Sequence, residues 1–276
     1  MRDQWVSDGR GGSFRVRSVG QGPPVVVLHG GGIDSREYER FARALGEHCS
    51  VHLYDRRGRP GAPPLGPGHT VEVDVDDLAR VLDHVGATRV IGHSGGAFVA
   101  ARAALRLPVE RLAVYDPGIS IDGSVATAWF EPYRQAMRSG DTLRAMALVG
   151  AGADPDGAAA RLPLPLQIAV LRLFVRTPVG RRMREQLPTV ETEVGQIIAN
   201  DAPAEAYAGI TATTLLAHGA RSASYFGDVC EALAAALPDG SALRIPRASH
   251  NAMNIARPAF VEPFAQFLTA RTTHTS

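Results

Sequence analysis

The chain has 276 residues, of which 45% are hydrophobic and 21% are charged, as in ordinary globular proteins. Its 29 Lys and Arg residues nearly balance 28 Asp and Glu residues, which excludes the strongly basic surface of a nucleic-acid-binding protein and a long acidic tail. Cys49 and Cys230 are too few for a disulfide framework or a four-cysteine zinc site. The polar N-terminus lacks the apolar core of a signal peptide, and no apolar run is long enough to span a membrane. We therefore expect a cytoplasmic protein with no nucleic-acid or membrane partner.

Short apolar runs, most of them followed by glycine or polar turn residues, recur along the chain. Runs of this kind are typical of strands that are buried on both faces of a parallel sheet. Two earlier segments, around 5–6 and 14–19, predict an antiparallel hairpin at the edge of that sheet, with its turn at 9–12. The six predicted core strands lie at 25–28, 51–54, 89–91, 112–115, 214–217 and 242–245.

The segments between these strands carry apolar residues at helical spacing. Residues 74–85 place valine and leucine on one helical face, and Gly86 ends the helix. Further helices are predicted at 96–107 and 228–237, and a last one opens at Pro258. The alternation of strands and helices predicts an α/β fold, with a mostly parallel sheet and helices on both faces.

Residues 119–210 interrupt this alternation, because they separate two core strands by far more chain than a simple crossover needs. We predict that they form a helical cap inserted after the sixth strand, over a core made of residues 1–118 and 211–276. The predicted cap helices lie at 129–137, 143–149, 166–175 and 190–198.

The segment Gly92-His93-Ser94-Gly95-Gly96 has the form G-x-S-x-G, between a predicted strand and an alanine-rich predicted helix. In that context a sharp turn holds the serine hydroxyl at the edge of the sheet, and small residues must flank it. Ser94 is therefore a candidate nucleophile, and the N–H of Gly95 would point toward an oxyanion. The alternative is a glycine-rich turn in which Ser94 only caps the helix.

A second glycine-rich turn, His29-Gly30-Gly31-Gly32, follows the predicted strand at 25–28. Glycines at that place let a peptide N–H face the same centre, so we expect Gly31, or as second choice Gly32, to supply the other oxyanion donor. A phosphate-binding loop is the alternative, but neither G-x-G-x-x-G nor a P-loop lysine is present.

A serine nucleophile needs a base, and His250 directly follows the last predicted strand. A residue that leaves this strand lies at the same sheet edge as Ser94, which makes His250 the candidate base. His218, at the end of the run 214–217, is the competitor. Four other histidines fit a place in a surface loop better than a catalytic role: His48, His69, His84 and His274.

Taken in order, these motifs resemble the alpha/beta-hydrolase fold superfamily. The residues that carry the resemblance are the turn at 29–32, Tyr54-Asp55-Arg56-Arg57-Gly58-Arg59, the G-x-S-x-G segment and Ser249-His250-Asn251, and they span nearly the whole chain. The chain looks most like single-domain bacterial members with a D-R-R-G-R-G loop and a Y-E-P-P segment after the sixth strand. The resemblance implies that the nucleophile, the base and the oxyanion donors fall on Ser94, His250, and Gly95 with Gly31.

The triad acid departs from the common family pattern. Most members carry it after the seventh strand in a G-x-x-D segment, which here reads Gly219-Ala220-Arg221-Ser222. Asp116 ends the preceding strand and matches the glutamate of the Y-E-P-P variant, so the resemblance implies that Asp116 orients the histidine. Asp228, or a Ser–His dyad without an acid, are the alternatives.

The arginines of 55–59 are expected to form internal ion pairs, with recognition of a substrate carboxylate as the alternative. The resemblance and the residues together imply a serine hydrolase that cleaves an ester, thioester or lactone of a small apolar molecule through an acyl-enzyme, without metal or organic cofactor. The same triad could instead serve a lactone-forming cyclase, a carbon–carbon bond hydrolase or a perhydrolase. A non-catalytic small-molecule binder is the other alternative. The oligomeric state is open.

Overall fold

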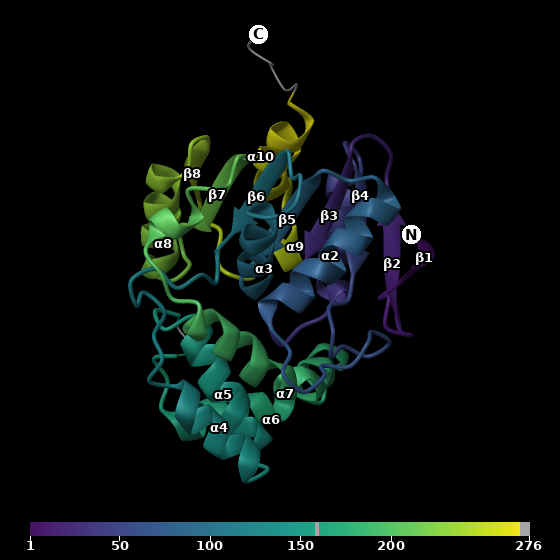
Figure 1. The fold of residues 1–276 in the computed structure, drawn as a ribbon. Coiled ribbons are helices and arrows are strands. Elements are labelled where there is room, and N and C mark those ends of the chain that lie inside the picture. The colour runs from purple at the N-terminus through teal and green to yellow at the C-terminus, as the bar shows by residue number, and fades with distance from the viewer. Residues whose placement is uncertain (158–159, 271–276) are drawn as a thin grey trace.

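A single eight-stranded sheet organises the computed structural model of the chain, which describes residues 1–157 and 160–270 (Figure 1). Its strand order is β1-β2-β4-β3-β5-β6-β7-β8. The hairpin β1–β2 is antiparallel and pairs antiparallel with β4, whereas all further neighbours are parallel. The bounds are β1 Arg2–Ser7, β2 Ser13–Val19, β3 Pro24–Leu28, β4 Ser50–Tyr54, β5 Arg89–His93, β6 Arg111–Tyr115, β7 Thr213–Gly219 and β8 Gly240–Ile245.

Helices cover both faces of the sheet, as the run of apolar residues in the central strands requires. In β3, Val26 and Leu28 join one hydrophobic cluster, which includes side chains of α2 (Val71–Val85), α3 (Gly95–Ala104) and α8 (Ser224–Ala236). Val25 and Val27 of the same strand join the opposite cluster, with α1 (Glu39–Leu45), α9 (Ala252–Ile255) and α10 (Pro258–Thr269). Successive residues of a strand thus face the two helical layers in turn. The predicted α/β architecture is confirmed.

Four helices separate β6 from β7 and lie together beyond one end of the sheet (Figure 1). We refer to these helices, α4 to α7, as the cap. They share a hydrophobic cluster of their own, centred on Tyr133, Met146 and Leu187, which supports the proposed division into core and cap. Their bounds are α4 Phe130–Arg138, α5 Thr142–Ala153, α6 Leu164–Phe174 and α7 Pro178–Ala199, and the short 3-10 helix Ala204–Tyr207 follows them.

Three helices differ most from the sequence-based expectation: α7 is longer than predicted, and α1 and α9 were not predicted. The last cap helix was expected at 190–198, but α7 has 22 residues and passes through Pro188. Its N-cap is Thr177, whose side chain accepts the N–H of Gly180, and Pro178 is its first residue, where proline is tolerated. Helix α1 was not predicted, because its 7 residues directly follow a 3-10 helix and give too short a periodic pattern.

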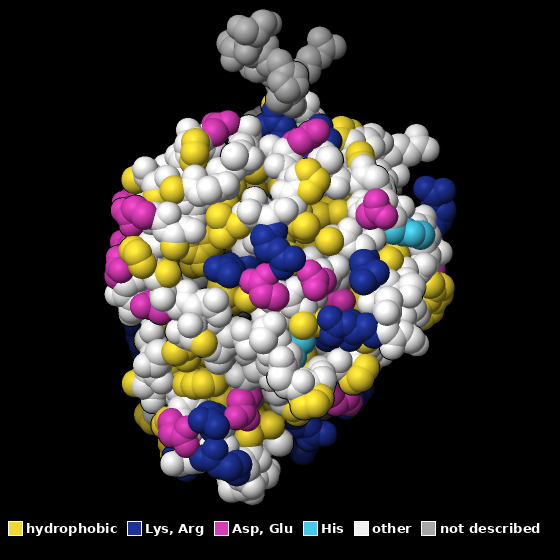
Figure 2. All heavy atoms as spheres, in the orientation of Figure 1, with side chains coloured by type: hydrophobic (Ala, Val, Ile, Leu, Met, Phe, Trp, Pro, Cys, Tyr) yellow, Lys and Arg dark blue, Asp and Glu magenta, His cyan; other side chains and the backbone are white. Residues whose placement is uncertain are grey.

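The surface shows no large field of one charge on the face seen in Figure 2, where positive and negative side chains are interspersed. This agrees with the balanced composition. Among the described residues, no helix combines the length and the apolar character that crossing a bilayer requires.

Candidate active site

Ser94 stands at the turn between β5 and α3, in a strained backbone conformation. Its φ of 52° and ψ of −125° are rare for a residue with a side chain. The flanking glycines explain how the turn closes: a Cβ at Gly92 would lie 2.5 Å from Cα of Ala97, and one at Gly96 would lie 2.5 Å from the carbonyl oxygen of His29. The turn therefore presents the Ser94 side chain at the carboxyl end of the parallel strands.

His250 and Asp116 form a hydrogen-bonded pair at the same sheet edge, with Nδ1 of His250 3.0 Å from Oδ2 of Asp116. Asp116 is fully buried at the end of β6. Its carboxylate also accepts the backbone N–H of Gly219 at 2.9 Å and the hydroxyl of Ser222 at 2.5 Å. Ser222, which occupies the usual place of the family's acid, thus donates to an acid on the neighbouring strand.

The ring of His250 packs against two other rings near the turn between β5 and α3 that carries Ser94, which we call the elbow. Phe226 stacks against it with ring centroids 5.0 Å apart, and the ring of His93, the neighbour of Ser94, lies 4.6 Å away. The hydroxyl of Tyr115 donates to the carbonyl of Ser249 at 2.6 Å, which fixes the loop that carries His250. Residues from β5, β6 and the chain after β8 therefore meet at one place.

The loop after β3 approaches the elbow closely, because a Cβ on Gly95 would lie 3.4 Å from the backbone nitrogen of Gly31. The N–H of Gly32 instead donates to Oε2 of Glu193 at 3.0 Å. Gly32, the second choice for an oxyanion donor, is therefore already engaged with the cap. Gly31 and Gly95 are the pair whose backbones lie side by side.

Two buried histidines support this region as neutral rings. Burial, together with the charges of Arg59 and Arg56, lowers the pKa of His29 well below its usual value. Burial and the charge of His250 do the same to the pKa of His93. Neutral His93 accepts the hydroxyl of Tyr38 on Nδ1 at 2.6 Å, and Tyr38 in turn accepts the N–H of Gly30 at 3.0 Å.

The arginines after β4 form internal ion pairs, as the sequence predicts. Arg57 bonds to Asp77 through two nitrogens, at 2.6 Å and 2.9 Å, and also to Asp8 at 3.1 Å. Arg56 and Arg59 both pair with Glu193 of α7. Glu193 was missed at the level of the sequence, since one glutamate in a polar helical pattern carries no signal of a partner far along the chain.

The alternatives for the acid and the base lie elsewhere. Asp228 belongs to α8 and is exposed. The ring of His218 lies against the same helix, where a Cβ at Gly227 would be 3.0 Å from its Cε1. His274 lies outside the described residues.

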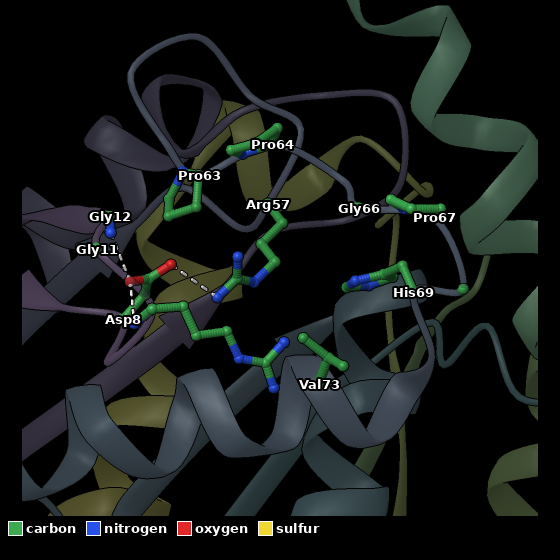
Figure 3. Close-up of a pocket in the computed structure, with 12 residues that line it drawn as sticks. Asp8, Gly11, Gly12, Arg57, Pro63, Pro64, Gly66, Pro67, His69 and Val73 are labelled. Atoms are coloured by element: carbon green, nitrogen blue, oxygen red, sulfur yellow. Dashed lines mark hydrogen bonds and ion pairs between the residues drawn. The ribbon is translucent and has the colours of Figure 1, made fainter.

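The cavity drawn in Figure 3, of about 470 Å³, is separate from the candidate site. It lies between the β1–β2 turn, the proline-rich loop after β4 and the start of α2, and the ion pair of Asp8 with Arg57 points into it. A second cavity, of about 330 Å³, lies beside the chain that follows β8. Neither is lined by Ser94 or His250. No cluster of three potential metal ligands occurs among the described residues.

Comparison with known proteins agrees with the fold. The sequence model of the alpha/beta hydrolase family matches residues 25–263. The chain belongs to this family. Among solved structures, an alpha/beta hydrolase from Sphaerobacter thermophilus is 25% identical, with a TM-score of 0.75 over 95% of this chain and 100% of the other. A bromoperoxidase from Bacillus anthracis shares the hydrolase fold, with a TM-score of 0.75 at 16% identity over 98% of this chain and 100% of the other.

Curated relatives of this alpha/beta hydrolase match over a shorter stretch. A pimeloyl-[acyl-carrier protein] methyl ester esterase from Shewanella woodyi is 34% identical over 100 residues, which cover 36% of each chain. A putative non-heme haloperoxidase from Mycobacterium phage D29 is 37% identical over 98 residues, which cover 34% of each chain. The chain thus matches about a third of the length of these curated relatives.

Proposed function

We propose that this alpha/beta hydrolase is a serine esterase that cleaves an ester, thioester or lactone of a small apolar molecule. The observation that carries the proposal is the hydrogen bond between His250 and buried Asp116, beside a serine held at positive φ. A carboxylate on Nδ1 leaves Nε2 free to accept a proton from a serine hydroxyl. Ser94, His250 and Asp116 would be the nucleophile, the base and the acid.

The proposed reaction has two halves. Oγ of Ser94 attacks the carbonyl carbon while His250 takes the hydroxyl proton, and the resulting oxyanion accepts the N–H groups of Gly31 and Gly95. The tetrahedral intermediate collapses, His250 returns the proton to the departing alcohol or thiol, and an acyl-enzyme forms. Water, deprotonated by His250, then releases the acid and regenerates Ser94.

The substrate class rests on the relatives and on the charges near the site. The curated relative from Shewanella woodyi is named for a methyl ester of a carrier-bound acyl group, which supports an acyl ester as substrate. The guanidinium groups of Arg56 and Arg59 are occupied by Glu193, which disfavours a substrate carboxylate in that place. We therefore expect uncharged acyl groups to be the better substrates.

The test is covalent labelling with a fluorophosphonate probe, followed by identification of the modified residue by mass spectrometry. We expect modification of Ser94 in the native protein, loss of labelling in Ser94→Ala, and strong loss in His250→Ala. A panel of p-nitrophenyl esters and lactones of increasing acyl length then ranks substrates. A native protein that does not react at Ser94, although the probe labels a control esterase, contradicts the proposal and favours a small-molecule binder.

A further inference from the structure

Glu193 of the cap helix α7 lies against the loop that carries Gly31, far from it in the sequence. Oε1 of Glu193 pairs with Arg56 and, at 2.7 Å, with Arg59. Oε2 accepts the N–H of Gly32 at 3.0 Å and the hydroxyl of Thr189 at 3.2 Å. The two carboxylate oxygens therefore join the cap to the loop that carries Gly31 and to the arginines that follow β4.

The loop is held at nearly every polar backbone group around Gly31. The N–H of Gly30 donates to Tyr38, and the carbonyl of Gly30 accepts from Nδ1 of His29 at 2.9 Å. Arg59 donates to the carbonyl of Gly30 at 3.3 Å and to that of Ile33 at 3.0 Å. No acceptor for the N–H of Gly31 is found among the described residues. Its neighbours thus hold the backbone of Gly31 in place beside Gly95 of the elbow, where a Cβ on Gly95 would lie 3.4 Å from the nitrogen of Gly31.

The two arginines and Glu193 form a buried cluster of charges in which the carboxylate pairs with both guanidinium groups. The side chains of Arg56, Arg59 and Glu193 are exposed to only 3%, 1% and 7%. Within the described parts of the chain, Glu193 is the one acidic group in ion-pair distance of either arginine. Without this carboxylate, the two buried guanidinium groups would lie side by side with no anion in ion-pair distance. Their mutual repulsion would push Arg59 away from the carbonyls that it holds.

We propose that Glu193 is a positioning residue, which aims the N–H of Gly31 at the oxyanion through Gly32 and Arg59. The inference rests on the proposed esterase function. It also assigns a catalytic purpose to a contact between cap and core: α7 stays docked during turnover, because its carboxylate completes the loop. Glu193 touches no reacting atom, so its effect falls on the stabilisation of the tetrahedral intermediate rather than on substrate binding.

The experiment compares Glu193→Gln with Glu191→Gln. Glu191 is on the same helix, but its side chain is 47% exposed, and its one ion-pair partner in the described parts of the chain is Arg134. We measure kcat and KM on a p-nitrophenyl ester, and inhibition by a boronic acid, whose adduct with a serine is tetrahedral like the intermediate. For Glu193→Gln we expect kcat to fall ~10–100-fold, which is less than the ~10²–10³-fold loss of kcat on removal of an oxyanion donor. Boronate inhibition should weaken by a similar factor. KM should stay within about threefold of the wild-type value. Glu191→Gln should match the wild type.

Three results would overturn the inference. A folded Glu193→Gln with wild-type kcat does so, as does a variant in which only KM changes, or one that loses kcat but keeps wild-type boronate inhibition. If Glu193→Gln does not fold, Glu193→Asp replaces it, since a shorter carboxylate keeps the charge but cannot reach both Gly32 and the arginines. Fluorophosphonate labelling of the wild type separates the two proposals: an inert wild type refutes both, whereas a reactive wild type with equally active variants refutes only the role of Glu193.

Discussion

Asp116, the proposed triad acid, follows β6, whereas the resemblance places the acid of most family members after the neighbouring strand β7. Its carboxylate accepts three hydrogen bonds, from His250, Gly219 and Ser222, although it has no exposed surface. Three donors fix the orientation of this buried carboxylate, and a fixed carboxylate can in turn orient an imidazole. Ser222 stands at the position that the resemblance gives to the acid of most family members, and here its hydroxyl donates to Asp116 instead.

Replacing Asp116 by Asn should lower kcat by ~10²–10⁴-fold, because the amide no longer holds His250 in the required tautomer or stabilises its cation. Ser222→Ala is the matched control. It removes one donor but keeps the carboxylate, and we expect a loss of about tenfold or less, in line with a single hydrogen bond to a charged group. Steady-state kinetics on one p-nitrophenyl ester measures both variants. A kcat for Asp116→Asn equal to that of Ser222→Ala would remove Asp116 from the triad.

At the scale of elements, the elbow between β5 and α3 depends on the absence of side chains. Gly92 and Gly96 let the turn and the helix approach to distances that no Cβ could tolerate. The positive φ of Ser94 is maintained because its backbone is held on both sides: its N–H donates to the carbonyl of Tyr115 at 3.1 Å, and its carbonyl accepts the N–H of Gly118 at 3.0 Å. The surrounding sheet thus stabilises a conformation that is locally unfavourable.

Gly92→Ala should lower the free energy of unfolding by about 2–3 kcal/mol, since its methyl group would meet the backbone of Ala97 and force the elbow apart. Gly150→Ala serves as the control. Gly150 lies within α5 with no atom in reach of an added Cβ, so alanine there should stabilise the protein by about 0.5–1 kcal/mol. Urea denaturation followed by circular dichroism measures both. Equal unfolding midpoints for the two variants would contradict this account of the elbow.

At the scale of the whole molecule, buried neutral histidines link the stability of the fold to pH. Burial lowers the pKa of His52 to about 4, and it lowers the pKa of His29 and of His93 well below 6.5. In the unfolded chain these rings take up protons near pH 6.5, whereas in the folded protein they do not. Their contribution to stability is complete above pH 6.5 and is lost progressively as the pH falls toward 4.

We therefore expect the free energy of unfolding to decrease from pH 7 to pH 5, with each such histidine adding at most about 1.4 kcal/mol per pH unit. Urea denaturation at half-unit pH steps gives the slope. His52→Gln is the control, because it removes one titrating ring at β4 and should make the curve less steep. A stability that is constant or rises on acidification over this range would contradict the neutral state of these rings.

The elements and the elbow could be predicted from the sequence because their causes are local. Apolar runs, helical spacing and glycines around Ser94 act within a few residues of one another. The strands from β3 to β8 and the turn that carries Ser94, the proposed nucleophile, could therefore be placed without coordinates. The short helix α1 and the true length of α7 escaped prediction, because tertiary packing and capping overrode a weak periodic signal.

What only the tertiary structure decided is which distant groups meet at the sheet edge. It paired His250 with Asp116 rather than with exposed Asp228, and it gave the N–H of Gly32 to Glu193. The sequence by itself determined the α/β alternation and the positions of Ser94 and Gly95. The partners of the loop after β3 depend on how α7 docks. Docking brings buried Glu193 to Gly32, 161 positions away in the sequence, and to Arg56, and no local pattern encodes such contacts.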